Sequence, residues 1–381
     1  MKSMRIIVKG LLVGLIAGAL LSSFTLISCK KEEKVIKIGA ILPLTGNLAF
    51  LGEGEKNGLL LAKDHLQKTL PGYKIDLIIE DMKGNPKEAV SIANKLISIN
   101  KVDFLFVSTT ASCNAVAPLV DKAGIIMFAM TIDPFITQKS PNIYRVWVNS
   151  KQIWDMLSNY ILKSGYKKIG LIRVDLEYGL MVKRILEENL KGKVKIVYDE
   201  PTKVGDRNYK DLLTRIKNVK VDAIAITEYS NDLVTLVKQM REYGIRTQLL
   251  GEVAWSADFV IKELGKLFEG EKDLVFVAPS FILGKNLNPR AQKFVDTYKR
   301  KYGKRPSWNE AYPYDAMLVL GEAIRKAGSL NVSKIKRELY NIQDFEGVTG
   351  KISMLKTGDA ISEMSYLTFE KGKVKKIKGW K

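Results

Sequence analysis

Hydroxyl-bearing residues cluster at one point of the chain, after a predicted strand and before a predicted helix. The strand is expected at Val102–Val107, and the hydroxyl-rich segment that follows it is 108–112. Hydroxyl groups and free backbone N–H groups at a helix N-terminus attract an anion such as a carboxylate. Thr110 and Ser112 are therefore candidate ligand-binding residues. Alternatively both residues only cap the helix, and capping and binding can coexist.

Aromatic residues with a polar tip follow other predicted strands. Tyr178 and Tyr229 each come shortly after the end of such a strand. A tyrosine in that position offers apolar area and one polar group, which suits a mostly apolar pocket with a few polar anchors. Trp255 could wall the same cleft, or it could pack against Phe259.

The acid Glu252 closes another predicted strand. Successive strand residues point to opposite faces, so a shift of one residue decides whether Glu252 faces a cleft. Glu228 is the alternative acid. If Glu252 and Thr110 face one cleft, the ligand carries a cation and an anion, as an amino acid does. If Glu252 faces away, an uncharged amide or an organic acid is expected instead.

Two further threonines lie in strand-end loops. Thr131 follows the predicted strand Ile125–Met130, and Thr45 lies beside Gly46 in the first loop. Both could approach a ligand, although the first loop could equally be an ordinary turn.

Residues for catalysis are missing from the sequence. The only histidine, His65, cannot build a zinc site, and Cys29 and Cys113 are the only cysteines. There is no glycine-rich phosphate loop and no recognisable acid–base pair at fixed spacing. We therefore expect no enzyme activity, no metal and no cofactor.

Short apolar runs alternate with amphipathic segments along the chain, a pattern that predicts parallel sheets with crossover helices. The predicted strands are Ile36–Leu42, Ile75–Glu80, Val102–Val107, Ile125–Met130, Lys168–Val174, Val194–Tyr198, Val221–Ile226, Gln248–Glu252, Leu274–Ala278, Gly350–Met354 and Tyr366–Phe369. The chain after Cys29 is about 350 residues long, which exceeds what one hydrophobic core normally serves.

The late helices, expected at Arg290–Tyr302, Ala311–Ala327 and Val332–Tyr340, have no strands between them. They need a sheet elsewhere to pack on, so the chain is expected to return to the first lobe. We expect lobe 1 to comprise 30–150 and 279–350, and lobe 2 to comprise 151–278 and 351–381. Several crossings between lobes make a hinge, which suits ligand capture.

The N-terminal segment 1–29 is typical of an export signal. A short basic stretch precedes the apolar run Leu11–Leu21, and the segment ends in Leu26-Ile27-Ser28-Cys29, which resembles the bacterial lipobox. Cys29 is then the lipidated N-terminus of the mature protein. The alternative is an uncleaved membrane anchor, because about 20 apolar residues can span a bilayer. Both place the folded part outside the cytoplasm, at the periplasm or cell surface.

The formal net charge of +20 is spread along the chain, with acids interleaved. Such a charge can indicate nucleic-acid binding. An exported protein meets little nucleic acid, so we expect a solvated lysine-rich surface and no nucleic-acid partner.

A set of short segments follows in order along the chain: Ile36–Gly46 (IKIGAILPLTG), Asn57-Gly58, Ala62–Asp64, Glu80-Asp81, Asn85-Pro86, Ala89-Val90, Tyr314–Ala316, Ala323-Ile324, Ala327-Gly328, Phe345–Ile352 (FEGVTGKI) and Gly358-Asp359. Together these segments resemble the branched-chain amino-acid and amide-binding proteins of ABC transporters, the Leu/Ile/Val-binding type. No single segment is specific, but the ordered set covers nearly the whole mature chain.

The resemblance implies an α/β fold of two Rossmann-like lobes, periplasmic binding protein-like of type I, joined by a three-stranded hinge. It assigns Thr110 to the ligand carboxylate, Glu252 to the ammonium, and Tyr178 and Tyr229 to cleft closure. This chain departs from the family at Ile132, where Thr131 is expected to substitute.

The implied function is capture of a small polar solute, an amino acid or amide, for an ABC transporter permease, by a monomer held to the membrane through its lipid. The alternatives are a ligand-sensing receptor module, or an amide, urea or organic-acid binder of the same fold.

Overall fold

The computed structural model describes residues 33–285 and 287–380. The expected signal segment and Cys29 lie outside the described residues. Within the described part, no helix combines the length and the apolar character needed to cross a membrane.

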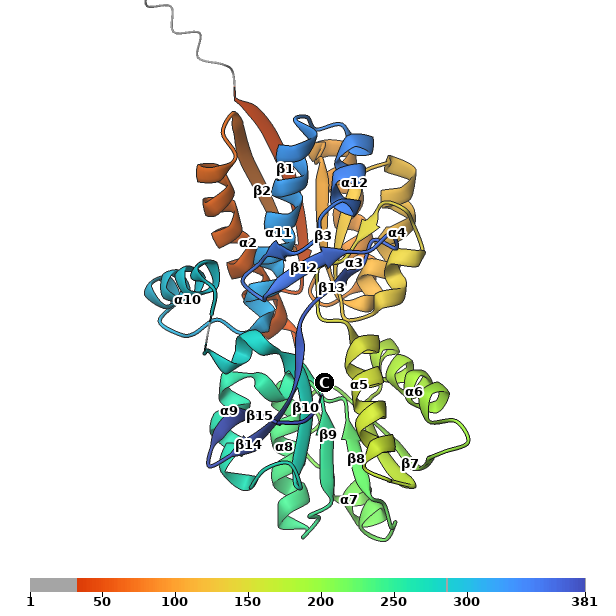
Figure 1. The fold of residues 1–381 in the computed structure, drawn as a ribbon. Coiled ribbons are helices and arrows are strands. Elements are labelled where there is room, and N and C mark those ends of the chain that lie inside the picture. The colour runs from red at the N-terminus through yellow and green to blue at the C-terminus, as the bar shows by residue number, and fades with distance from the viewer. Residues whose placement is uncertain (1–32, 286, 381) are drawn as a thin grey trace, which may run out of the picture.

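Two separate sheets organise the molecule (Figure 1). The first contains, in spatial order, β2 (Tyr73–Asp81), β1 (Lys34–Leu42), β3 (Phe104–Ser108), β4 (Ile126–Met130) and β5 (Ile143–Tyr144). The second contains β15 (Lys373–Lys376), β14 (Met364–Glu370), β10 (Leu274–Pro279), β9 (Gln248–Gly251), β8 (Ala223–Ile226), β6 (Lys168–Val174) and β7 (Lys195–Thr202). A small third sheet contains β11 (Phe345–Glu346), β12 (Lys351–Met354) and β13 (Ala360–Ile361).

Strand direction follows the expected α/β pattern. The first sheet is parallel throughout, and the second is parallel except where β14 and β15 pair antiparallel at one edge. Every residue of β3, β4, β8 and β9 is buried. Such continuous apolar strands are expected where helices cover both faces of a parallel sheet. The predicted α/β fold of two Rossmann-like lobes is confirmed.

Helices cover these sheets (Figure 1). Along the chain they are α2 (Ala49–Thr69), α3 (Pro86–Lys95), α4 (Thr110–Ala123), α5 (Ser150–Lys163), α6 (Glu177–Leu190), α7 (Lys210–Lys217), α8 (Ser230–Glu242), α9 (Asp258–Leu264), α10 (Pro289–Tyr302), α11 (Trp308–Ala327) and α12 (Val332–Tyr340). A π-helical turn, Leu96–Asn100, extends α3.

The late helix α11 packs on α2 beside the first sheet, as the absence of late strands predicted. The two backbones approach so closely that a Cβ on Gly58 would lie 2.3 Å from the carbonyl oxygen of Glu310. Asn309 Nδ2 also donates to the carbonyl of Leu51 at 2.9 Å. Glycine at position 58 therefore permits the return of the chain to the first sheet.

The position at which the chain returns to the second sheet lies further along the sequence than expected. We expected lobe 2 to resume at residue 351, but Lys351–Met354 pairs with β11 and β13 instead. The chain enters the second sheet at Met364. The lysine-rich C-terminal segment forms the edge strand β15, where lysines discourage pairing with another chain. The division into two lobes stays our proposal, with this later boundary.

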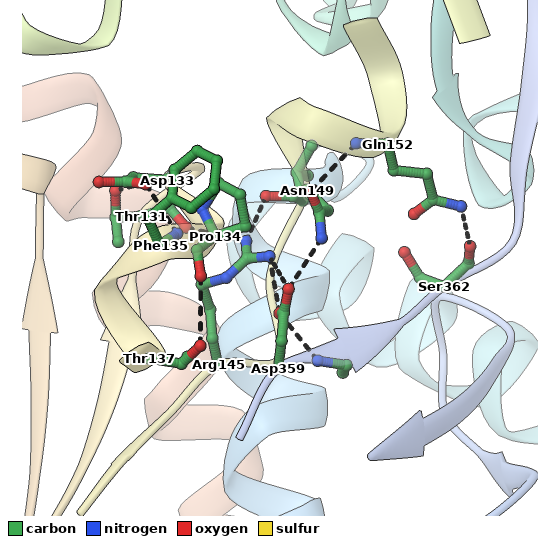
Figure 2. Close-up of polar contacts among 12 residues, drawn as sticks. Thr131, Asp133, Pro134, Phe135, Thr137, Arg145, Asn149, Gln152, Asp359 and Ser362 are labelled. Carbon is green, nitrogen blue, oxygen red and sulfur yellow. Dashed lines mark hydrogen bonds and ion pairs between the residues drawn. The ribbon is translucent and has the colours of Figure 1, made fainter. Parts of the chain in front are cut away.

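A buried ion pair lies where the chain leaves the first sheet for α5 (Figure 2). Arg145, fully buried, lies 2.7 Å from the carboxylate of Asp359. Its guanidinium also donates to the carbonyls of Val148 at 2.7 Å and Thr131 at 3.2 Å. Asn149, which caps α5, donates to Asp359 at 2.8 Å. We call Arg145, Asp359 and Asn149 the crossing network.

Candidate functional site

A cavity of about 280 Å³ lies between the two sheets, at the carboxyl ends of their strands. This is where open α/β sheets bind ligands. Its size is at the small end of the roughly 300–1,000 Å³ typical of ligand pockets. Thr110, Thr131, Tyr178, Tyr229 and Glu252, all expected at the site, line the cavity.

The wall from the first sheet is built on the N-terminus of α4. Thr109, just before it, has φ of +66° and ψ of 145°, and no side chain caps the helix. A non-glycine residue at positive φ is strained, and such strain concentrates at functional sites. The Thr110 and Thr131 hydroxyl oxygens lie 2.6 Å apart. Free N–H groups and hydroxyls thus meet at one point, which suits an anion.

The crossing network fixes the position of this wall. Arg145 holds the backbone carbonyl of Thr131, whose hydroxyl accepts a hydrogen bond from Asp133 N at 3.2 Å. Thr131 therefore has both its main chain and its side chain constrained (Figure 2).

The wall from the second sheet carries an acid. Glu252 follows β9, is 4% exposed and lines the cavity. Its Oε2 has no hydrogen-bond partner among the described residues. Burial raises the pKa of Glu252 to about 7, and the neighbouring Tyr178 hydroxyl partly offsets this. The presence of Glu252 in the cavity lining favours the interpretation that this residue faces the cleft.

Cross-sheet contacts show the two walls close together. The rings of Phe50 and Tyr229 meet edge to face with centroids 6.1 Å apart. Asn114 Nδ2, on α4, donates to Glu177 Oε1, on α6, at 2.9 Å. The structure therefore has the form of a cleft closed over its cavity.

Three expected residues lie away from the cavity. Ser112 is buried and accepts a hydrogen bond from the Thr109 hydroxyl at 3.0 Å. Thr45 donates to Asp81 at 2.6 Å and belongs to a turn. Trp255 lies over Gly251, where an added Cβ would be 1.9 Å from its indole nitrogen.

Trp255 packs against Phe268 and Phe369, with ring centroids 5.6 and 6.1 Å away, rather than walling the cleft. The alternative acid Glu228 is also buried, but it accepts a hydrogen bond from Thr202 and does not line the cavity. Sequence spacing did not separate these residues from the lining residues, because burial depends on which element covers each loop.

Sequence reasoning missed Glu55, which lies on α2, is 1% exposed and lines the cavity. The Ser108 hydroxyl donates to Glu55 Oε1 at 2.7 Å. Burial raises the pKa of Glu55 to about 8, and this hydrogen bond opposes the rise. A signal was present, because Glu55 shares a helix face with the buried Gly52 and Leu59.

The cavity is otherwise apolar and aromatic. Phe50, Trp147 and Trp308 line it, among other apolar residues. Three glutamates and no lysine or arginine are found among the described residues that line it. Within the part of the chain that the structure describes, no cluster of side chains could hold a metal ion. The arrangement can bind a small solute, and its acids favour a ligand that donates hydrogen bonds.

Comparison with known proteins agrees with this geometry. The chain is 25% identical over 339 residues to "Leu/Ile/Val-binding protein homolog 3" of Brucella melitensis, covering 86% of this chain and 89% of that protein. The LivJ substrate-binding protein of a branched-chain amino acid transporter from Streptococcus pneumoniae, solved with isoleucine, is 26% identical, with a TM-score of 0.78 and coverage of 90% and 98%.

A solute-binding protein from R. palustris, solved with benzoate, shares the fold with a TM-score of 0.79, at 20% identity and coverage of 90% and 95%. These relatives are solute-binding proteins, not enzymes. A family model described as "Periplasmic binding protein" matches residues 35–373, and the location outside the cytoplasm that this family implies agrees with the predicted export. This chain is therefore a member of the periplasmic binding protein family.

Proposed function

We propose that this protein captures an amino acid outside the cytoplasm and delivers it to an ABC importer. The observation that carries the proposal is the polarity of the cavity. The uncapped N-terminus of α4 lies in one wall, and the buried carboxyl of Glu252 lies in the other. A zwitterion matches both walls at once.

In this proposal Thr110, Thr131 and the first N–H groups of α4 take the ligand carboxylate. Helix N-termini favour negative charge through both their free donors and the helix dipole. Glu252 takes the ammonium, which supplies the missing partner of its free oxygen. The aliphatic part of the ligand lies among Phe50 and the two tryptophans Trp147 and Trp308.

Tyr178 and Tyr229 close over the ligand as the two walls approach. Both are buried or half-buried in the closed form, and burial raises the pKa of each tyrosine above its ordinary value. They therefore remain neutral phenols that can donate or accept a hydrogen bond.

Titration calorimetry with a panel of amino acids, amides and short organic acids tests the proposal, combined with small-angle scattering. We expect one or more amino acids to bind and to reduce the radius of gyration. No binding and no compaction with any amino acid would refute the proposal.

An organic acid or neutral amide is the second candidate ligand. The N-terminus of α4 can hold a carboxylate or a carbonyl oxygen without an ammonium nearby, and a pKa of about 7 leaves Glu252 partly protonated at neutral pH. The same fold holds benzoate in the R. palustris protein. Binding of the organic acids in the panel, with no amino acid bound, would favour this candidate.

We further infer that Cys29 carries the lipid anchor and that the protein acts as a monomer. The lipobox-like residues before Cys29 support the anchor. Mass spectrometry of the mature N-terminus from a membrane fraction, with a Cys29→Ala control, tests the first point. Sedimentation of a chain beginning at residue 33 tests the second.

A further inference from the structure

Glu55 is a cavity-lining acid that the proposed function leaves without a task. It is 1% exposed and reaches the cavity from α2, on the side of the first sheet. One of its oxygens accepts the Ser108 hydroxyl hydrogen, and Oε2 has no hydrogen-bond partner among the described residues. An unpaired buried acceptor is costly, and such groups in folded proteins call for an explanation.

We propose that Glu55 is a second recognition carboxyl of this cavity, and that the ligand is an amino acid whose side chain carries an N–H donor. This inference rests on the proposed function. The ligand's carboxylate and ammonium are then engaged by α4 and Glu252. A third polar group of the ligand is left to meet Glu55.

The composition of the cavity wall supports a donor rather than an acceptor on the ligand side chain. Among the described lining residues, no lysine or arginine can neutralise Glu55 or Glu252. The third acid, Glu177, already accepts a hydrogen bond from Asn114. A purely aliphatic side chain would bury Glu55 beside apolar groups without supplying a partner, which is unfavourable.

Two donor groups share this chemistry, a neutral amide and an ammonium. Burial raises the pKa of Glu55 to about 8, so the carboxyl is largely protonated in the empty protein near neutral pH. A protonated carboxyl both donates and accepts, as a primary amide does. An ammonium would instead favour the ionised carboxylate.

Calorimetry with leucine, glutamine and lysine, on the intact folded domain at pH 7, tests the inference. The variants are Glu55→Leu, which removes both polar atoms, and Glu55→Gln, which keeps the shape and the acceptor for Ser108. Glu228→Gln is the matched control, because Glu228 is also buried, with its pKa raised to about 7, but does not line the cavity.

We expect the unaltered protein to bind glutamine or lysine about tenfold or more tightly than leucine. Glu55→Leu should abolish that preference, because it removes the partner of the ligand's donor and also the unfavourable contact with an aliphatic side chain. Glu55→Gln distinguishes the two donors, since it should retain most glutamine binding and lose lysine binding. Glu228→Gln should leave all three affinities unchanged.

The inference is overturned if the unaltered protein prefers leucine, or if Glu55→Leu leaves the ratio of affinities unchanged. In both cases the proposed capture of amino acids still stands. Failure of every amino acid to bind the unaltered protein overturns the proposed function, and the inference with it. If Glu55→Leu does not fold, as judged by thermal melting, the comparison of lysine and glutamine on Glu55→Gln decides the outcome.

Discussion

The two walls of the cavity offer a ligand different kinds of polar groups. The first-sheet wall offers the N–H groups of α4 with the neutral hydroxyls of Thr110 and Thr131. The second-sheet wall offers a buried carboxyl, Glu252, beside the tyrosines Tyr178 and Tyr229. The α4 end of the first wall favours negative charge through neutral groups, and the second wall carries an acid whose pKa burial has raised. A ligand held by both walls has its direction fixed by this difference.

The walls also differ in how firmly they are held. Arg145 and Asp359 brace Thr131 from behind, whereas Glu252 has one carboxylate oxygen with no partner among the described residues. We therefore expect substitutions behind the first wall to reduce stability, and substitutions in the second wall to reduce affinity.

Removal of the Arg145 guanidinium should have the largest effect. Arg145→Met leaves Asp359 buried without its cation, and should lower the free energy of unfolding by about 3–5 kcal/mol. Urea denaturation at pH 7 measures this change. The control Arg325→Met removes an exposed guanidinium paired with Glu322, and should leave the midpoint unchanged. Equal urea midpoints for both variants would contradict a stabilising role of the Arg145–Asp359 ion pair.

Loss of the Glu252 charge should have the next largest effect, on affinity rather than stability. Glu252→Gln should weaken amino-acid binding about 30-fold or more, because a desolvated ammonium then lacks its counter-charge. Glu228→Gln serves as the control, with unchanged affinity. Similar calorimetric affinities for Glu252→Gln and the unaltered protein would assign the ammonium to another group.

The pH dependence of stability should report the two buried glutamates, Glu55 on the first-sheet side of the cavity and Glu252 on the second-sheet side. Burial raises the pKa of Glu252 from 4.5 to about 7 and that of Glu55 to about 8, so the folded protein holds protons that the unfolded chain has released. The unliganded protein should therefore lose stability as pH rises from 4.5 through about 8, by up to about 1.4 kcal/mol per pH unit for each carboxyl.

Urea denaturation at several pH values between 5 and 8 measures that slope. A Glu55→Gln, Glu252→Gln double variant should show a flatter profile, because neither amide titrates. A slope that is the same in both proteins would show that other groups cause it.

The smallest effect is expected for the hydroxyls of the first wall. Thr110→Val should weaken binding about five- to tenfold, since backbone N–H groups of α4 still hold the carboxylate. Thr45→Ala should have no effect on affinity, because Thr45 bonds to Asp81 away from the cavity. Equal losses for the two threonine variants would point to a structural rather than a binding role.

Much of the fold could be predicted from local pattern. The strand Lys168–Val174 and the helix Val332–Tyr340 have the bounds that apolar periodicity indicated. The edge strand Lys373–Lys376 was missed, because three of its four residues are lysines, which carry little apolar signal, and because its pairing with β14 is a contact between segments.

The site was predicted only in part. Strand-end position brought Thr110, Thr131, Tyr178, Tyr229 and Glu252 to the cavity, since parallel strands end at one edge of a sheet. The same rule also selected Trp255, whose ring packs on Phe268 and Phe369. It missed Glu55, because that residue reaches the cavity from within a helix.

The sequence by itself determined the alternation of strands and helices and the glycine at position 58 that lets two helices touch. Those properties depend on residue type and spacing along the chain. Only the tertiary structure decided that Glu55 and Glu252 face one cavity while Ser112 and Trp255 are buried elsewhere. Facing and burial depend on which distant segment covers each side chain, and spacing along the chain does not contain that information.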